Sequence, residues 1–178
     1  MENSNQAKSY YANTHEVENQ AYPLENYNAY TTDAALMEEV KRGGGEWAEE
    51  ELIRFGLECG QPERIKLGFQ ANANKPTFRP HDHYGRRVDQ VDFHPAYHEL
   101  MEIHHRENIH ALPWTNPQKG AHVVRTAKAY LQSLVETGHA CPMTMVFACV
   151  PALKHQPDLA EKWIPLITNG HYDPRNIP

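Results

Sequence analysis

The sequence predicts an all-α fold, a helical bundle with an extended N-terminal arm and a long irregular loop. Three observations support this prediction. Apolar residues recur at helical spacing, capping residues and glycines mark the ends of the helical stretches, and we find no stretch with the alternation of a half-buried strand. With 178 residues, the chain is long enough for one compact core. We therefore expect an arm over residues 1–30 and a helical domain over residues 31–178.

The predicted arm is rich in Asn, Tyr and Gln, and its apolar residues follow neither a helical nor a strand period. These residues are Val17, Tyr22, Leu24, Tyr27 and Tyr30. The pattern indicates an extended segment that lies on another surface. The first dozen or so residues offer little to offset the entropy lost on ordering, so we expect them to be loosely held.

Three helices are predicted before residue 75. Thr31, Thr32 and Asp33 can cap the first, which ends at the glycines 43–45. The second covers residues 45–60, and Pro62 can open the third, over residues 62–74. In the second helix, the residues expected inside are Trp47, Leu52, Ile53, Phe55 and Leu57, and those expected in solvent are Glu49, Glu50 and Arg54.

Residues 75–94 predict a long irregular connection with a short turn at Tyr84-Gly85, because they contain two prolines, a glycine and mixed charge. Pro95 can then start a helix over residues 95–108, and Pro113 ends the stretch that follows. The inward positions of this helix are Leu100, Met101 and Ile103.

Residues 119–137 show the most regular helical pattern, with about five turns. The apolar side is Val123, Val124, Ala127, Leu131, Leu134 and Val135, and the polar side is Arg125, Lys128, Gln132 and Glu136. The next helix starts at Cys141-Pro142, and its stretch 143–150 is apolar except for Thr144. We expect that stretch to be buried on every side at the centre of the bundle. Pro151 should kink or restart the helix.

The last predicted helix covers residues 158–167. Asp158 and Glu161 form a plausible capping pair at its start, and Gly170 ends the helical stretch.

Charge and composition exclude several classes of protein. A net charge of −6 and two isolated basic pairs, Lys41-Arg42 and Arg86-Arg87, do not favour nucleic-acid binding. No apolar run approaches the ~20 residues of a membrane span, and the first residues lack the order of a signal peptide. Three cysteines without Cys-x-x-Cys spacing fit a reduced compartment, so we expect a cytoplasmic protein.

The histidines suggest a metal site, but their spacing does not favour one. Seven of the 12 lie within thirty residues: His81, His83, His94, His98, His104, His105 and His110. Adjacent residues such as His104 and His105 point about 100° apart on a helix. We therefore favour surface and loop positions for these side chains over metal ligation.

No other pattern predicts catalytic chemistry. Cys141 and Cys149 lie in the most apolar stretch, so we expect them to be buried, structural thiols. The glutamates 49–51 should face water, and the glycines 43–45 follow a helix rather than a strand, unlike a phosphate-binding loop. By this chemistry alone, the chain is a scaffold without catalytic, cofactor-binding or metal-binding residues.

Four stretches together resemble one enzyme family. They are THEVENQAYPLENYNAYTTDAAL (14–36), GRRVDQVDFHPAYHELM (85–101), CPMTMVFACVPAL (141–153) and EKWIPLITNGHYD (161–173). In order and spacing they resemble the AidB-type branch of the acyl-CoA dehydrogenases. The resemblance runs from about Thr14 to the end of the chain.

This resemblance implies a flavoenzyme in which FAD takes a hydride from the β-carbon of an acyl-CoA while a glutamate removes the α-proton. Such enzymes have a helical N-terminal domain, a β-domain and further helical domains, and they usually form homotetramers. The AidB branch is associated with the alkylation response, and its substrate is an open question. The resemblance places the end of this chain before the flavin-contacting segment, so the isolated chain should lack flavin absorbance and turnover.

The resemblance also supplies candidate site residues. Met143, Thr144 and Phe147 match the family element that borders the acyl channel. Core packing is the alternative for Met143 and Phe147, whereas the Thr144 hydroxyl needs a hydrogen-bond partner. Two other hypotheses remain, a free-standing helical interaction module without catalysis and a His-rich metal-binding protein. A domain taken from a larger enzyme should also expose apolar surface and self-associate.

Overall fold

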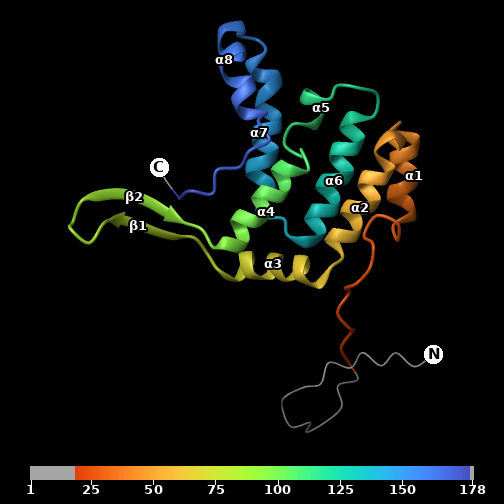
Figure 1. The fold of residues 1–178 in the computed structure, drawn as a ribbon, viewed down its shortest axis with the longest axis horizontal. Helices are drawn as coiled ribbons and strands as arrows, with labels where there is room; N and C mark the ends of the chain where they lie inside the picture. Colours follow the sequence, from red (N-terminus) through yellow and green to blue (C-terminus); the bar gives the residue numbers. More distant parts are fainter. Residues whose placement is uncertain (1–18, 177–178) are drawn as a thin grey trace.

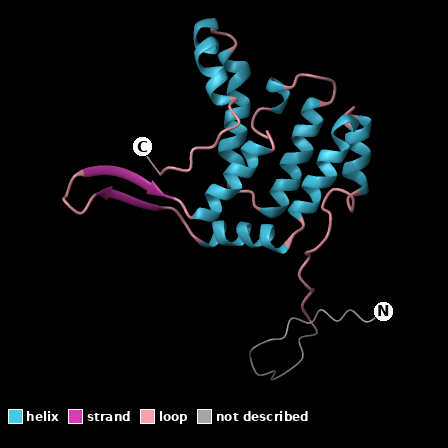
Figure 2. Ribbon diagram, in the orientation of Figure 1, coloured by secondary structure: helices cyan, strands magenta, loops and turns pink. Residues whose placement is uncertain are grey.

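The computed structural model describes residues 19–176 as a helical bundle from which a β-hairpin projects (Figure 1, Figure 2). Its elements are α1 (Ala34–Arg42), the 3-10 turn η1 (Glu46–Ala48), α2 (Glu49–Cys59), α3 (Pro62–Ala73), β1 (Thr77–His81), β2 (Arg87–Asp92), α4 (Pro95–Arg106), α5 (Leu112–Thr115), α6 (Ala121–Val135), α7 (Ala140–Leu153) and α8 (Pro157–Ile167). Helices dominate the described part of the chain, so the predicted helical bundle is confirmed. The start of the arm, predicted to be loosely held, lies outside the described residues.

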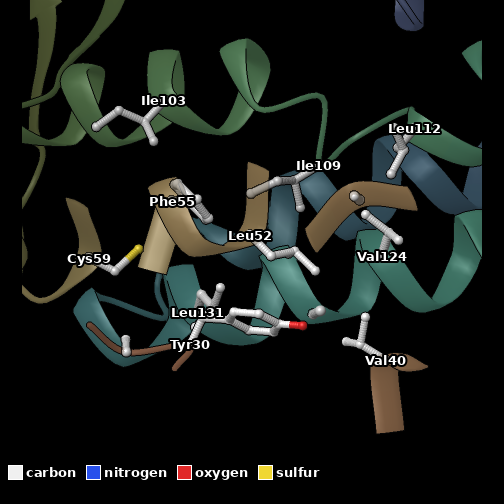
Figure 3. Close-up of a cluster of buried hydrophobic side chains, with 13 residues drawn as sticks. Tyr30, Val40, Leu52, Phe55, Cys59, Ile103, Ile109, Leu112, Val124 and Leu131 are labelled. Atoms are coloured by element: carbon white, nitrogen blue, oxygen red, sulfur yellow. The ribbon is translucent and has the colours of Figure 1, made fainter. Parts of the chain in front are cut away.

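The core forms where α1, α2, α4 and α6 meet (Figure 3). Its labelled side chains are Tyr30, Val40, Leu52, Phe55, Cys59, Ile103, Ile109, Leu112, Val124 and Leu131. Leu100, Met101 and Ile103 of α4 are all buried, as the helical spacing predicts. Ile53 and Leu57 of α2, predicted to point inward, are exposed instead.

The predicted helix ends are largely confirmed. The Asp33 carboxylate accepts a hydrogen bond from the Leu36 N–H at 2.9 Å, and Gly43 caps the other end of α1. Pro62 and Pro95 occupy the first turns of α3 and α4. Two details of the last helices differ. α7 does not restart at Pro151 but continues to Leu153, and α8 starts at Pro157, which places Asp158 inside its first turn rather than at the cap.

The chain before α1 lies on α2 through residues 26–30. The Asn26 N–H donates to the Gly60 carbonyl at 2.7 Å, and the Ala29 N–H donates to the Gly56 carbonyl at 2.9 Å. A Cβ atom at Gly60 would lie 1.9 Å from the Tyr27 carbonyl oxygen, so only glycine permits this close approach. Tyr30 is buried at the end of this segment.

The irregular loop predicted for residues 75–94 is in fact an antiparallel hairpin. β1 and β2 pair in the register Thr77↔Asp92 and Phe78↔Val91, with an irregularity after Arg79. Every residue of β1 is exposed, because the hairpin projects from the bundle with both faces open (Figure 1). Such a strand does not need the apolar-polar alternation that marks a half-buried one, and this explains the missed prediction.

The turn at the tip of this hairpin lies where it was predicted. Gly85 has a φ of 78°, which favours glycine, and the Asp82 carboxylate accepts hydrogen bonds from the N–H groups of Tyr84 and Arg86.

The polar side predicted for α6 is also partly wrong. Lys128 is only 1% exposed and Gln132 is fully buried, whereas Leu134, predicted to be apolar core, is half-exposed. The Lys128 ammonium donates to the Glu51 carboxylate at 2.6 Å and to the Glu107 carbonyl at 2.9 Å. Because α6 is covered on several sides, Lys128 is buried, and its two hydrogen bonds offset the lost hydration of the ammonium.

Candidate functional site

α7 lies at the edge of the bundle, not at its centre (Figure 1). Met143 and Val150 are its buried residues. The prediction that this apolar stretch is buried on every side is therefore wrong. An apolar composition indicates that the surface of a helix is buried by neighbours in the complete protein, but it does not show which element buries it. Within residues 19–176, α8 packs along α7 and the α5 region covers a second side.

We call the exposed side of this helix the outer face of α7. It consists of Cys141, Thr144, Met145 and Ala148, whose spacing places them on one side of a helix. Met145 is 65% exposed. Cys141, which was predicted to be a buried thiol, is exposed here, whereas Cys149 is half-buried. The outer face carries no charged residue, and none occurs elsewhere in α7.

The three candidate channel residues do not share one environment. Met143 is buried against the bundle, and Thr144 is exposed on the outer face of α7. The Phe147 ring lies between Trp114, 5.1 Å away between ring centroids, and the Arg125 guanidinium, 3.7 Å from the ring centroid. Of the three, Thr144 is exposed, Phe147 is partly exposed and Met143 is buried. Met145 and Cys141, which our prediction omitted, lie beside it, and their spacing from Thr144 was the signal in the sequence.

Phe147 is part of the contact that holds α7 to α5 and α6. The Trp114 indole N–H donates to the Phe147 carbonyl at 3.1 Å, and the Arg125 Nε donates to the Ile109 carbonyl at 2.9 Å. Burial lowers the pKa of Arg125, and the aromatic face below it compensates part of the lost hydration. These contacts fix which side of α7 remains open.

α8, which packs on α7, has exposed apolar residues of its own. Leu159, Trp163 and Leu166 recur at helical spacing on α8 and are all exposed, and α8 has no buried residue. α7 and α8 lie together at one end of the bundle (Figure 1), and each carries exposed apolar residues.

Several histidines predicted to lie on the surface are buried. His81 and His83 in the hairpin are exposed, but His104 and His110 are almost completely buried. His139, which was not among the seven histidines of that prediction, is also almost completely buried. The rings of His104 and His139 lie 5.1 Å apart. Burial lowers the pKa of His104 to about 2 and that of His110 to about 4, so both imidazoles are neutral. Among residues 19–176, no group of three or more His, Cys, Asp or Glu side chains is placed to hold a metal ion.

Histidines also hold segment 168–176 against α4. His110 Nε2 donates to the Asn169 carbonyl at 3.0 Å. His98 accepts a hydrogen bond from the Tyr172 hydroxyl at 2.7 Å and donates to the Asn176 side-chain oxygen at 2.9 Å. A cavity of about 610 Å³ adjoins this contact, and its lining combines Arg64 and Arg106 with acidic and apolar residues of α4.

A network of charged side chains connects α2, α4 and α6. Glu107 is buried, and burial alone would raise its pKa, but hydrogen bonds from Arg54 and Arg106 and the charge of Lys128 lower it. Arg106 also binds Glu58 at 2.9 Å. Each buried charge in this network has a partner, which indicates a structural role.

The described fold, with its uncovered α7 and α8, can be compared with known proteins. The family model of the adaptive response protein AidB N-terminal domain matches residues 19–174. The chain belongs to the AidB N-terminal domain family. Over 167 residues, which are 93% of the chain, it is 40% identical to the Escherichia coli (strain K12) protein named acyl-CoA dehydrogenase AidB. It spans 31% of the length of that AidB protein.

Two solved structures share the fold of this AidB N-terminal domain. Caenorhabditis elegans ACDH-11, in a crystal structure with C11-CoA, matches 94% of the chain with a TM-score of 0.75 and 22% identity. The apo form of Bd2924 matches 86% of the chain with a TM-score of 0.74 and 21% identity. The chain covers 30% and 31% of these two proteins, respectively. The helical fold expected from the family resemblance is therefore confirmed.

One further property concerns membranes. No helix in residues 19–176 combines the length and the apolar character that a membrane span requires.

Proposed function

We propose that this chain forms the N-terminal helical part of an FAD-dependent acyl-CoA dehydrogenase of the AidB type, acting in the cytoplasm in the response to alkylation. Its role in the oxidation of an acyl-CoA at a CH–CH bond is to border the acyl channel and to support assembly of a homo-oligomer. The main support for the proposal is that a chain of this family has an exposed side of α7 without any charged residue. We propose that FAD and the catalytic glutamate would lie in other parts of such an enzyme.

The chemistry of the outer face of α7 suits an acyl chain. A thioether, a thiol, a methyl group and a hydroxyl lie together on one side of the helix, without a charge that would oppose an apolar ligand. Met145 is flexible and polarizable, so it can adapt to different chain lengths. The relative ACDH-11, whose fold this chain shares, was crystallised with C11-CoA.

Thr144 and Met145 are the residues that we propose for contact with the acyl chain. Met143 packs into the bundle, and Phe147 is enclosed by Trp114 and Arg125. We infer that Phe147 positions the helix, while Thr144 and Met145 face the channel.

The α8 surface supports the second part of the proposal. Leu159, Trp163 and Leu166 leave a stripe of apolar side chains open to solvent, and such stripes mark protein interfaces. We propose that this stripe packs against other domains or subunits of the assembled enzyme.

A chimaera tests the proposed acyl contact. In it, this chain replaces the matching third of the E. coli AidB protein, and bound FAD, measured by its visible absorbance, shows that the assembly is intact. We expect a photoreactive acyl-CoA, with a diazirine at the end of the acyl chain, to label α7 at Cys141, Thr144 or Met145.

Variants of the same chimaera add a quantitative test. Thr144→Glu and Met145→Glu should each weaken acyl-CoA binding by about tenfold or more, because a carboxylate would be desolvated beside the acyl chain. Phe69→Glu is the matched control, since Phe69 is an exposed apolar residue on α3. Labels confined to other helices in an FAD-loaded chimaera, or equal losses in all three variants, would contradict the proposal.

A further inference from the structure

The described part of the arm, residues 19–25, exposes two large apolar side chains. Tyr22 is 90% exposed and Leu24 is 72% exposed, with Pro23 exposed between them. At Asn26 the backbone has a φ of 58° and is fixed to the Gly60 carbonyl, and residues 19–25 extend away from the bundle at this point (Figure 1). Residues 22–24 therefore form an exposed apolar segment, and the chain is fixed to the bundle directly after it, at Asn26.

The same molecule has an apolar groove of about 570 Å³ between α1 and α6. Val40, Val123 and Ala127 contribute to its apolar lining. The groove narrows where Gly43 meets Val123, because a Cβ at Gly43 would lie 2.7 Å from the Val123 methyl group. Its volume lies in the range of sites that bind small ligands or short peptide segments.

The edge of this groove carries an aromatic ring and a cation. Tyr130 lines one end, and its hydroxyl donates to the Asp33 carboxylate at 3.1 Å, which holds the ring in place. Arg42 lines the groove from the end of α1, next to Lys41, and forms an ion pair with Glu39.

We propose that residues 22–25 of one copy bind in the α1–α6 groove of a second copy, and that the exchange is reciprocal. Proline restricts the segment to an extended conformation, so little conformational entropy is lost on binding, and grooves lined by aromatic rings bind such segments. Leu24 and Tyr22 cover the apolar lining. In this pose the Glu25 carboxylate lies near the basic side chains Lys41 and Arg42 at the C-terminal end of α1, whose own partners Glu46 and Glu39 are exposed.

A second copy is the occupant because one chain carries both parts of the contact, and within residues 19–176 both are exposed. Residues 19–25 extend away from the bundle that contains α1 and α6 (Figure 1). In two copies related by a two-fold axis, each arm occupies the groove of the other copy. No arm or groove is then left for a third copy, so the assembly is a dimer. This inference rests on the homo-oligomer part of the proposed function and does not depend on the acyl-channel part, which the FAD-loaded chimaera tests separately.

Sedimentation equilibrium of the 178-residue chain tests the exchange. We expect Tyr22→Ser and Leu24→Ser each to weaken dimerisation by about tenfold, since each removes a large apolar contact. Phe69→Ser on α3 is the matched control, because Phe69 is 72% exposed, like Leu24. The proposal is overturned if the chain stays monomeric at high concentration, or if the control weakens association as much as the arm variants do.

Crosslinking shows whether each arm binds in the α1–α6 groove of its own copy or of the second copy. One copy carries Ala21→Cys, just before the binding segment, and a tagged second copy carries Thr126→Cys, both with Cys141 and Cys149 replaced by Ser. A short bismaleimide should join the two copies, whereas Phe69→Cys in place of Thr126→Cys should give no product. With both cysteines in one dilute chain, an internal crosslink faster than that between copies would overturn the exchange in favour of an arm bound to its own groove.

Discussion

α6 and α7 show that the polarity of a helix does not determine its burial. α6 contains Lys128 and Gln132, yet both side chains are buried in the middle of the bundle, and Lys128 has two hydrogen-bond partners there. α7 has no charged residue, yet its outer face is open. A charged group such as Lys128 can be buried when it is hydrogen-bonded, and an apolar face stays open when no neighbour within residues 19–176 reaches it. Position in the fold separates these two helices more than composition does.

The largest expected loss of stability comes from a cavity at a core position of α6, the buried helix of the pair. Leu131→Ala in α6 should lower the free energy of unfolding by about 3 to 4 kcal/mol, because Leu131 is completely buried. Leu134→Ala, on the same helix but half-exposed, should cost less than about 1 kcal/mol. Urea denaturation measures both values. Similar losses for the two variants would show that α6 is not the central helix.

Removal of the buried cation in α6 should have the next largest effect. Lys128→Ala should cost about 3 kcal/mol, because Glu51 and the Glu107 carbonyl lose their partner and a cavity remains. Lys128→Met keeps most of the volume and should cost about 1 kcal/mol less than the alanine variant. If Lys128→Ala is as stable as the parent chain in urea, the side chain is not paired as described.

Acid should destabilise the interior around α4. His110 has a folded-state pKa of about 4, below its ordinary 6.5, because burial disfavours the charged form. Its contribution to stability is present above pH 6.5 and is lost as the pH falls towards 4. Between pH 7 and pH 5, the parent chain should lose about 1 to 2 kcal/mol more than His110→Gln does, as measured by urea denaturation at each pH. Parallel pH profiles would argue against a buried neutral His110.

The smallest effect is expected on the outer face of α7. Met145→Glu should change the free energy of unfolding by less than about 0.5 kcal/mol, because Met145 is exposed and the charge stays in water. The same substitution should reduce binding of the hydrophobic dye ANS to the isolated chain. A large loss of stability would mean that α7 is covered within the chain, as its composition first suggested.

The sequence predicted the helices better than their surroundings. Caps and breakers such as Asp33, Pro62 and Pro95 are local signals, and the structure has helix ends at those places. Burial is set by distant contacts. The pairing of Lys128 with Glu51, 77 residues away, leaves no local trace, so a helical wheel places Lys128 in solvent.

The candidate site could be predicted only in part. Thr144 stood out as a hydroxyl in an apolar helix, and it is exposed. Phe147 belonged to the same apolar pattern, but its enclosure depends on Trp114 and Arg125 from other elements. The buried histidines were missed for a similar reason. The packing of His104 against His139 brings together residues of separate helical segments, and their spacing along the chain does not encode it.

The contact of segment 168–176 with α4 limits how α7 and α8 can move. The chain leaves α4 after Arg106 and comes back to the same region, where His98 and His110 hold Tyr172, Asn176 and Asn169. α5, α6, α7 and α8 all lie between these points, so this contact closes a long stretch of chain on α4. α7 is held a second time, by the stacking of Phe147 on Trp114 and by Arg125 over the Phe147 ring. A neighbour that covers the outer face of α7 therefore meets a surface that is held in place from two directions.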